Sequence, residues 1–181
     1  MISRASMALE FPCSVLLVAA MNPCPCGFHG DPTRRCTCGP QGVHKYRAKI
    51  SGPLLDRMDL QVDVPSAAFD KLTEARRGET SETVQARVQA ARERQERRFA
   101  DSPTRCNGLM SPAEIERFAT PPPEGVELLR KASERLGLSA RAYSRILEVA
   151  RTIADLAGSE GIQVAHLAEA IQYRKLDRVG G

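Results

Sequence analysis

Two close pairs of cysteines are the feature that most restricts how this chain can fold. Cys24 and Cys26 form one pair, Cys36 and Cys38 form the other, and the polar loop GFHGDPTRR lies between them. Four thiolates satisfy the tetrahedral coordination of zinc, and two pairs on facing turns can converge on one ion. The loop has no apolar core of its own, so a metal would be its main source of order. The C-x-C-x9-C-x-C spacing therefore predicts a structural zinc site, with reduced, metal-free thiols as the alternative.

The cellular compartment decides whether clustered cysteines bind a metal or form disulfides. The apolar run VLLVAAM near the N-terminus is too short for a signal peptide, and no membrane span follows it. We therefore expect a cytoplasmic protein without membrane contact, where metal ligation is the commoner use of such cysteines. His29 is a spare ligand, although an isolated histidine is more often unrelated to a metal. Cys13 and Cys106 have no partner nearby in sequence and are predicted to pack in the interior.

The first 65 residues predict a fragment of an α/β sheet. Residues 14–21, SVLLVAAM, form an apolar run that is typical of a strand buried on both faces of a parallel sheet. Residues 41–50 have helical spacing, and residues 58–64, MDLQVDV, alternate as a second strand does. Two strands do not make a stable doubly wound domain by themselves.

The rest of the chain predicts helices joined by short links, which indicates a small bundle. Alanine, arginine and leucine are abundant and only 4% of residues are aromatic, a composition that favours helices over sheets. The predicted helices cover residues 82–99, 111–119, 124–136, 140–158 and 164–174. We expect an α/β part over residues 1–65, a helical connector over 66–107, a helical domain over 108–175 and a tail over 176–181.

Two polar residues lie at the ends of the predicted strands. Asn22 follows the first strand, at the edge where α/β folds bind ligands, or it simply ends the strand and begins a turn with Pro23. Arg57 precedes the second strand, where a guanidinium can reach a phosphate across a subunit interface. The pattern alone favours a plainer interpretation, in which Arg57 forms an ion pair with Asp56 or Asp59.

Three segments carry a resemblance to a known family. They are FPCSVLLVAAMNPCPCG with the second cysteine pair, AKISGPLLDRMDL at 48–60, and RLGLSARAYSRILEVARTIADLAGSEGIQVAHLAEAIQYR at 135–174. Together they resemble the C-terminal part of the magnesium-chelatase-like AAA+ ATPases of the ComM (YifB) family. The 181 residues contain neither the G-x-x-x-x-G-K-[ST] motif of a P-loop nor an acidic Walker B strand. The resemblance implies a remnant of an AAA+ P-loop ATPase core, with two strands and a zinc-type loop, followed by an all-α lid.

The resemblance also implies roles for three of the residues. Asn22 matches sensor 1, which positions the attacking water, and Arg57 matches the arginine finger that acts on the ATP of a neighbouring subunit. Arg141 matches the sensor 2 arginine of the helical lid. Phosphoryl transfer needs a placed water and added positive charge, so these roles are chemically reasonable. From the residues alone, Arg141 is equally a solvated arginine, and Arg145 and Arg151 on the same predicted helix are alternatives to it.

The implied function is that of a ring, expected to be a hexamer of same-family subunits, which couples ATP hydrolysis to branch migration of DNA in transformation and recombination. ATP and Mg²⁺ are then cofactors of the complete ATPase, and this chain alone is not expected to hydrolyse ATP. Arg34 and Arg35 in the cysteine loop are the candidates for DNA contact, whereas the basic helix predicted at 82–99 is more often a solvated face. The alternatives are a zinc-stabilised, non-catalytic scaffold or adaptor, and a motor subunit of the chelatase type.

Overall fold

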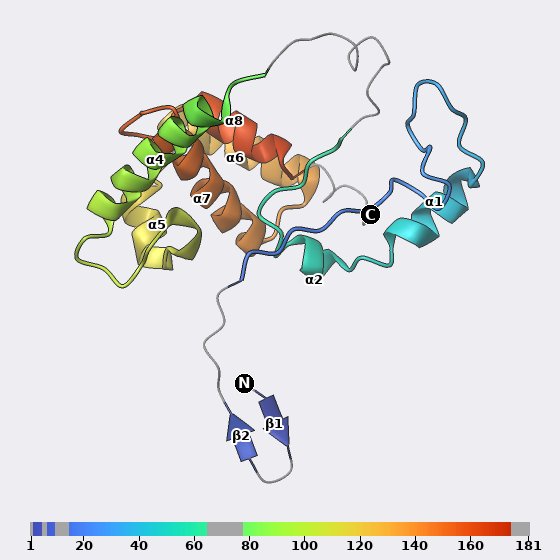
Figure 1. Ribbon diagram of the computed structural model, residues 1–181, viewed down its shortest axis with the longest axis horizontal. Coiled ribbons are helices and arrows are strands. Elements are labelled where there is room, and N and C mark those ends of the chain that lie inside the picture. The colour runs from blue at the N-terminus through green and yellow to red at the C-terminus, as the bar shows by residue number, and fades with distance from the viewer. Residues whose placement is uncertain (1, 5–6, 10–14, 65–77, 175–181) are drawn as a thin grey trace. The chain divides into compact units, whose positions relative to one another are not determined.

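The structure, a computed structural model, describes residues 2–4, 7–9, 15–64 and 78–174 of the chain (Figure 1). These residues fall into two compact units, Met1–Val43 and His44–Gly181. The first unit carries the cysteine pairs, and the second carries most of the helices. The start of the predicted connector, residues 66–77, and the predicted tail at 176–181 lie outside the described residues.

The first unit contains a short antiparallel hairpin and the beginning of helix α1. Strands β1 (Ile2–Arg4) and β2 (Met7–Leu9) pair with each other, and the sequence analysis predicted neither of them. Helix α1 (Gly39–Arg47) begins directly after the second cysteine pair. Gly39 adopts a φ of 63°, a left-handed conformation that glycine reaches without the clash that a Cβ causes. The chain can therefore turn sharply from the cysteines into the helix.

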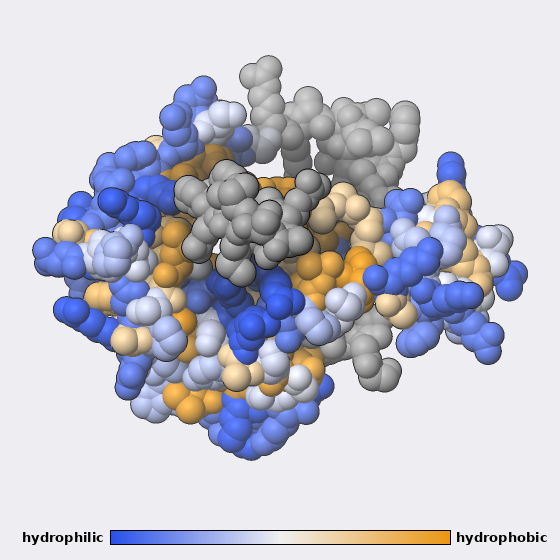
Figure 2. All heavy atoms as spheres, turned by 90° about the horizontal axis from the view of Figure 1, so that it is seen from below, coloured by the Kyte–Doolittle hydropathy of each residue, from blue (hydrophilic) through white to orange (hydrophobic). Residues whose placement is uncertain are grey.

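The strand predicted at 14–21 is wrong over the residues that the structure describes. Residues 15–21 are irregular, and the exposed fractions of Val15, Leu16, Leu17 and Val18 range from 63% to 91%. A strand needs a neighbour to bind its backbone N–H and C=O groups, and the described residues pair no strand with this run. Exposed apolar side chains appear as orange patches on the surface in Figure 2.

The strand predicted at 58–64 is also absent, and the buried face is not the predicted one. Leu60, Val62 and Val64 of the predicted apolar face are exposed, whereas Gln61 between them is buried. The N–H of Gln61 donates to the carbonyl of Tyr173 at 2.9 Å, so this segment binds the end of a helix instead of a strand. The predicted two-stranded α/β remnant is therefore not present among the described residues.

The second unit is helical, as predicted. Its elements are α2 (Gly52–Leu55), α4 (Ser81–Arg98), the 3₁₀ turn η1 (Asn107–Leu109), α5 (Pro112–Phe118), α6 (Pro123–Leu136), α7 (Ala140–Leu156) and α8 (Val164–Gln172). The helices predicted from 82 onward are confirmed to within a few residues at their ends. These helices, α4 to α8, are called the helical unit below.

Local capping explains where several of these helices begin and end. The hydroxyl groups of Thr80, Ser111 and Ser139 accept hydrogen bonds from backbone N–H groups in the first turns of α4, α5 and α7. Ser111 and Glu114 complete a capping box at the start of α5. Helix α6 ends at Gly137 in a left-handed conformation. The boundaries are thus set by short sequence patterns.

Helix α7 is the central element of the second unit and contacts α4, α5, α8 and η1 (Figure 1). Its apolar face buries Ile146, Leu147 and Ala150 in a core with Leu129 of α6 and Leu167 of α8. Burying one such aliphatic side chain stabilises a fold by about 1.5–3 kcal/mol. The core therefore fixes the position of α7 and of the elements that contact it.

A buried carboxylate joins α4 to α7 beside this core. Asp155, whose side chain is fully buried, accepts two hydrogen bonds from Arg98 at 2.5 and 2.6 Å. Arg151, one turn earlier on α7, donates to the same carboxylate at 3.0 Å, and Asn107 donates to it at 2.8 Å. Burial raises the pKa of Asp155, but the hydrogen bonds from Arg98 and Asn107 and the charge of Arg151 outweigh this, so the pKa lies below its ordinary value.

We expect that Asp155→Ala lowers the free energy of unfolding by about 3–5 kcal/mol at pH 7, because it leaves Arg98 and Arg151 without their buried partner. Asp101→Ala, which removes an exposed carboxylate, is the control and should change the free energy of unfolding by less than about 0.5 kcal/mol. Urea unfolding measures both. Since the pKa of Asp155 is lowered in the folded state, its stabilisation is present above its ordinary pKa of about 4 and is lost as the pH falls through the folded value. The stabilising role of Asp155 is contradicted if Asp155→Ala lowers the free energy of unfolding as much in acid as at pH 7, or no more than Asp101→Ala does.

Candidate functional site

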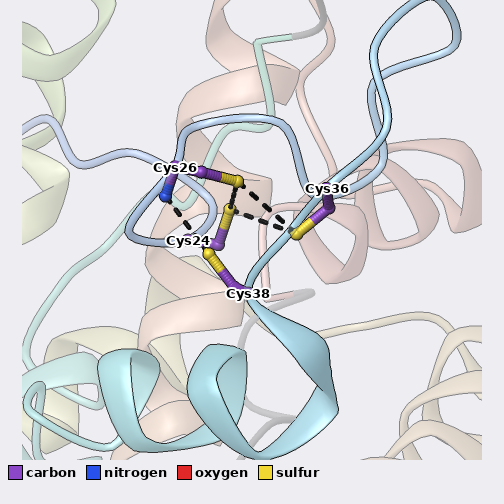
Figure 3. Close-up of side chains that lie close together, drawn as sticks. All are labelled: Cys24, Cys26, Cys36 and Cys38. Atoms are coloured by element: carbon purple, nitrogen blue, oxygen red, sulfur yellow. Dashed lines mark hydrogen bonds between the residues drawn. The ribbon is translucent and has the colours of Figure 1, made fainter.

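The four cysteines predicted as metal ligands lie together in the structure (Figure 3). Their sulfur atoms are all within 4.8 Å of one another. The Sγ atoms of Cys24 and Cys26 are 3.4 Å apart, and Cys36 lies 3.7 Å and 3.6 Å from these two. The N–H of Cys26 donates to the Sγ of Cys38 at 3.3 Å. Each residue offers one sulfur, so the cluster can hold a metal ion with four ligands.

Tight turns bring the two pairs together. The N–H of Gly27 donates to the carbonyl of Cys24 at 3.0 Å, and Gly27 takes a φ of 83° that suits glycine. Between the pairs, the carboxylate of Asp31 accepts from the N–H groups of Thr33 and Arg34, both at 2.8 Å. Such a turn is local and needs no packed core. The loop is therefore shaped by its own hydrogen bonds and by the cysteines at its ends.

The environment of the sulfurs favours thiolates at some positions and opposes them at others. Backbone hydrogen bonding at Phe28 and Thr37 lowers the pKa of Cys26 to about 5. At Cys38, the hydrogen bond from the Cys26 backbone lowers the pKa, but burial and the neighbouring sulfurs of Cys26 and Cys24 raise it to about 12. Four thiolates this close repel one another, so full ionisation needs a cation among them. A metal ion held by the four sulfurs would be such a cation.

Asn22, Arg34 and Arg35 lie in the same unit as the cysteines, and all three are exposed. Asn22 precedes the first cysteine pair and does not end a strand, because the preceding residues are irregular. The guanidinium of Arg34 lies over the ring of Phe28, 5.2 Å from its centroid, and this contact orients it along the loop. The role predicted for Asn22 therefore stays a prediction. The exposed side chains of Arg34 and Arg35 are accessible to a ligand.

The ion pair that the pattern favoured for Arg57 is wrong. Arg57 is exposed, and its guanidinium donates to the carbonyl of Pro53 at 2.9 Å, the one hydrogen bond of this side chain among the described residues. Its two acidic neighbours bind elsewhere. Asp56 accepts a hydrogen bond from Ser139, and Asp59 lies 3.3 Å from Nε of Arg145. The guanidinium is therefore left without a carboxylate partner in the described part of the chain.

The three candidate arginines on α7 differ in their surroundings. Arg151 is buried and binds Asp155 together with two backbone carbonyls, so it is a structural residue. Arg145 is partly buried and pairs with Glu148 at 2.6 Å. Arg141 is exposed, and within residues 15–64 and 78–174 its side chain has no hydrogen bond or ion pair. Among the three, Arg141 is the one whose guanidinium has no such partner in these described residues, and its role as sensor 2 stays a prediction.

The sequence analysis missed two residues near these arginines. Ser139 caps α7 and donates its hydroxyl hydrogen to Asp56 at 2.9 Å, so the residue before Arg57 is in direct contact with the residue two positions before Arg141. Arg174, with 1% of its surface exposed, binds the carbonyl of Met58. Ser139 directly precedes the helix predicted at 140–158, where a serine is a common cap, but no sequence signal pointed to its second partner or to Arg174.

Comparison with protein families and with curated proteins gives consistent matches. A sequence model described as magnesium chelatase, subunit ChlI, matches residues 1–72, and the model of the C-terminal region of that subunit matches residues 78–174. The chain is 42% identical over 179 residues to competence protein ComM of Haemophilus influenzae and 40% identical to YifB of Escherichia coli. An uncharacterised protein of Mycobacterium tuberculosis is 36% identical over 165 residues.

These matches cover nearly all of this chain but only part of the relatives. The H. influenzae and E. coli alignments span 98% of the chain and 34% of each relative, and the M. tuberculosis alignment spans 91% and 32%. The chain thus corresponds to about a third of the length of the curated relatives that it matches. None of the helices in the described residues is long and apolar enough to cross a membrane.

We expect the chain to bind Co²⁺, used as a spectroscopic probe, through the four clustered sulfurs. Tetrahedral thiolate coordination should give intense absorption bands that saturate at about one ion per chain. Cys36→Ser should weaken binding at least about tenfold because it removes one of the four ligands, and Cys106→Ser should not, since Cys106 lies outside the cluster. Equal spectra for the two variants would show that the ion binds elsewhere.

Proposed function

The chain belongs to the magnesium chelatase subunit ChlI family, as the C-terminal portion of a ComM- and YifB-like member, and from this we propose that it completes the ATP-hydrolysing sites of a ring-shaped motor. In this proposal Arg57 is the arginine finger, Arg141 is the sensor 2 arginine and Asn22 is sensor 1. ATP and Mg²⁺ bind to the complete ATPase, in which this chain meets a P-loop core.

The observation that carries the proposal is that the guanidinium of Arg57 has no carboxylate partner among the described residues. Two carboxylates flank it in sequence, yet both are bound to other partners, and in the described part of the chain the Arg57 side chain binds the carbonyl of Pro53 alone. An arginine that serves stability pairs with a carboxylate, as Arg98 does with Asp155. An arginine that meets the charge developing on a transferred phosphoryl group must instead remain unpaired until the neighbour's nucleotide arrives.

Arg141 adds support from the helical unit. It lies in the first turn of α7, its side chain is exposed, and Arg145 and Arg151 on the same helix are already engaged. A guanidinium binds phosphate oxygens through two parallel N–H groups, which suits contact with ATP. Asn22 would hold the attacking water through its amide group. These three side chains supply positioning and positive charge, which is most of what phosphoryl transfer requires of a protein.

We further propose that the metal in the cysteine cluster is zinc and that it is structural. Zinc prefers four thiolates in a tetrahedral site, and a site closed by four protein ligands leaves no position for substrate. The chemistry it supplies is the stabilisation of the loop between the two pairs. That loop carries Arg34 and Arg35, both exposed, which makes it a suitable surface for phosphates of DNA.

DNA is the substrate that we propose for the motor, with same-family subunits arranged as a hexamer and branch migration as the outcome. The relative from H. influenzae is named a competence protein, which is consistent with this proposal. The basic helix α4 contributes less than its composition suggests. Arg87 pairs with Glu79 at 2.9 Å and Arg98 with the buried Asp155, so two of its arginines are already neutralised.

Zinc content tests the metal proposal directly. We expect elemental analysis of the chain, purified under reducing conditions without added metal, to find about one zinc per chain. Cys36→Ser should lose this zinc and make residues 24–38 accessible to proteases, while the helical unit keeps its unfolding transition, because the core of that unit contains no cysteine of the cluster. Cys106→Ser serves as the matched control. A freshly reduced preparation without any metal would refute the proposal.

The finger role is tested in the complete ATPase. Arg57→Ala should lower turnover by about 10³–10⁵-fold and leave ATP binding nearly unchanged, because a finger meets charge that develops only in the transition state. Mixing this variant with a subunit that has an inactive P-loop and an intact Arg57 should restore activity, since the second subunit donates its finger. Arg97→Ala, at an exposed arginine of α4, is the control. Activity of Arg57→Ala within a few-fold of the parent, or no recovery on mixing, would reject the assignment and favour a scaffold.

A further inference from the structure

The segment that carries Arg57 is fastened to the helical unit on both sides of that residue. This segment, residues 52–61, will be called the finger segment, and it includes the single turn of α2. On one side of Arg57, Oδ2 of Asp56 accepts the hydrogen bond from Ser139 at 2.9 Å, and Oδ1 lies 3.6 Å from the guanidinium of Arg174. One carboxylate therefore binds the cap of α7 and Arg174, two residues beyond the end of α8.

On the other side of Arg57, the contacts are made by the backbone. Arg174 donates to the carbonyl of Met58, and the N–H of Gln61 donates to the carbonyl of Tyr173 at 2.9 Å. Arg174 is almost fully buried, so water does not compete for its hydrogen bonds. The end of α8 thus binds both a side chain and the backbone of the finger segment.

A third attachment comes from the middle of α7. Nε of Arg145 lies 3.3 Å from the carboxylate of Asp59. Arg145 is itself fixed by Glu148 at 2.6 Å and by the carbonyl of Gly108 at 3.1 Å. Because these contacts restrict the guanidinium in advance, little further side-chain entropy is lost when it binds Asp59. Exposed ion pairs of this kind contribute little by themselves, so the attachment acts together with those of Asp56.

We propose that Asp56 and Asp59 are positioning residues, which hold the finger segment on the helical unit so that Arg57 and Arg141 are presented as one body. The proposal rests on the proposed function of Arg57. Among the described residues, the side chains that bind these aspartates cap α7, belong to it or follow α8, whereas the side chain of Arg57 hydrogen-bonds within its own turn. A movement of the helical unit therefore moves the finger with it. Precise placement of such a group matters, since a displacement of about 1 Å can cost about 10²-fold in rate.

The attachment can be tested on this chain without any ATPase assay. We expect the amide of Gln61 to be protected from hydrogen exchange in the parent and to exchange about tenfold or more faster in Asp56→Ala, because the segment is released from Ser139 and Arg174. Asp56→Asn keeps an acceptor for Ser139 and should give an intermediate rate. Asp63→Asn, at an acidic residue just beyond the segment, is the matched control. An unchanged rate in Asp56→Ala, with the helical unit folded by circular dichroism, would overturn the attachment.

The positioning role is tested in the complete ATPase by placing the substitution on one side of the active site. In mixed rings, one subunit has an inactive P-loop and donates the finger, and the other has Arg57→Ala and hydrolyses ATP. Asp56→Ala should lower activity about ten- to a hundredfold more when it is placed in the donor than when it is placed in its neighbour. A substitution that only weakens folding lowers activity equally from either side, and that result would overturn the proposal.

Two outcomes separate this inference from the proposed function. If Arg57→Ala is active but Asp56→Ala releases Gln61, the finger assignment fails while the attachment stands as a structural feature. If Arg57→Ala is inactive and recovers on mixing but Asp56→Ala has no effect on the donor side, the finger stands and the positioning role fails. Asp59→Ala provides a second variant for both measurements, because it removes only the exposed contact with Arg145 and leaves the partners of Asp56 intact.

Discussion

The buried carboxylate of Asp155 is the interaction on which the arrangement of the helical unit depends. It binds arginines from α4 and from α7, and Asn107 of η1 also donates to it. Because Asp155 and Arg151 are charged and buried, the helices cannot slide past each other without leaving an unpaired charge in an apolar environment. This fixes the position of α7, and the opposite end of the same helix carries Ser139 and Arg141. The placement of these two residues is thus a consequence of electrostatics at the other end of the helix.

The first unit, which carries the four cysteines, depends on a different kind of constraint. It has few buried apolar side chains, among them Val43, and its loop consists of polar residues and turns. Four sulfurs in contact supply the constraint that a core provides elsewhere, and their mutual repulsion when ionised makes that constraint conditional on a cation. A loop of this kind can present Arg34 and Arg35 without burying either of them. One unit is therefore a helical body around a packed core, and the other carries a loop whose four sulfurs can hold a metal ion.

What could be predicted from sequence follows from the range of the interactions involved. The cysteine pairs and the helices predicted at 124–136 and 140–158 depend on local patterns, and the structure confirms them as a sulfur cluster and as α6 and α7. The cap Ser139 and Gly137, which ends α6, are local features of the same kind. The two strands could not be predicted correctly, because an apolar run such as 15–18 becomes a strand only beside another strand. The partners of the finger segment lie 83 and 116 positions away in sequence, so no spacing rule could assign Asp56 to Ser139 or Met58 to Arg174. The expected pairing of Arg57 with its neighbours was wrong for the same reason.

The charged contacts of the second unit separate the arginines that are bound from those that are exposed. Arg98, Arg145, Arg151 and Arg174 are each bound to carboxylates or carbonyls, and the burial of Arg151 and Arg174 makes their contacts necessary for the fold. Arg57 and Arg141 are exposed and have no carboxylate partner in the described part of the chain, which costs the fold little free energy. The protein also directs the two acidic residues nearest to Arg57 toward other cations. If Asp56 and Asp59 were not bound to these residues, their carboxylates would be free to neutralise the guanidinium of Arg57. Because both are engaged elsewhere, the charge of Arg57 stays available to an anion.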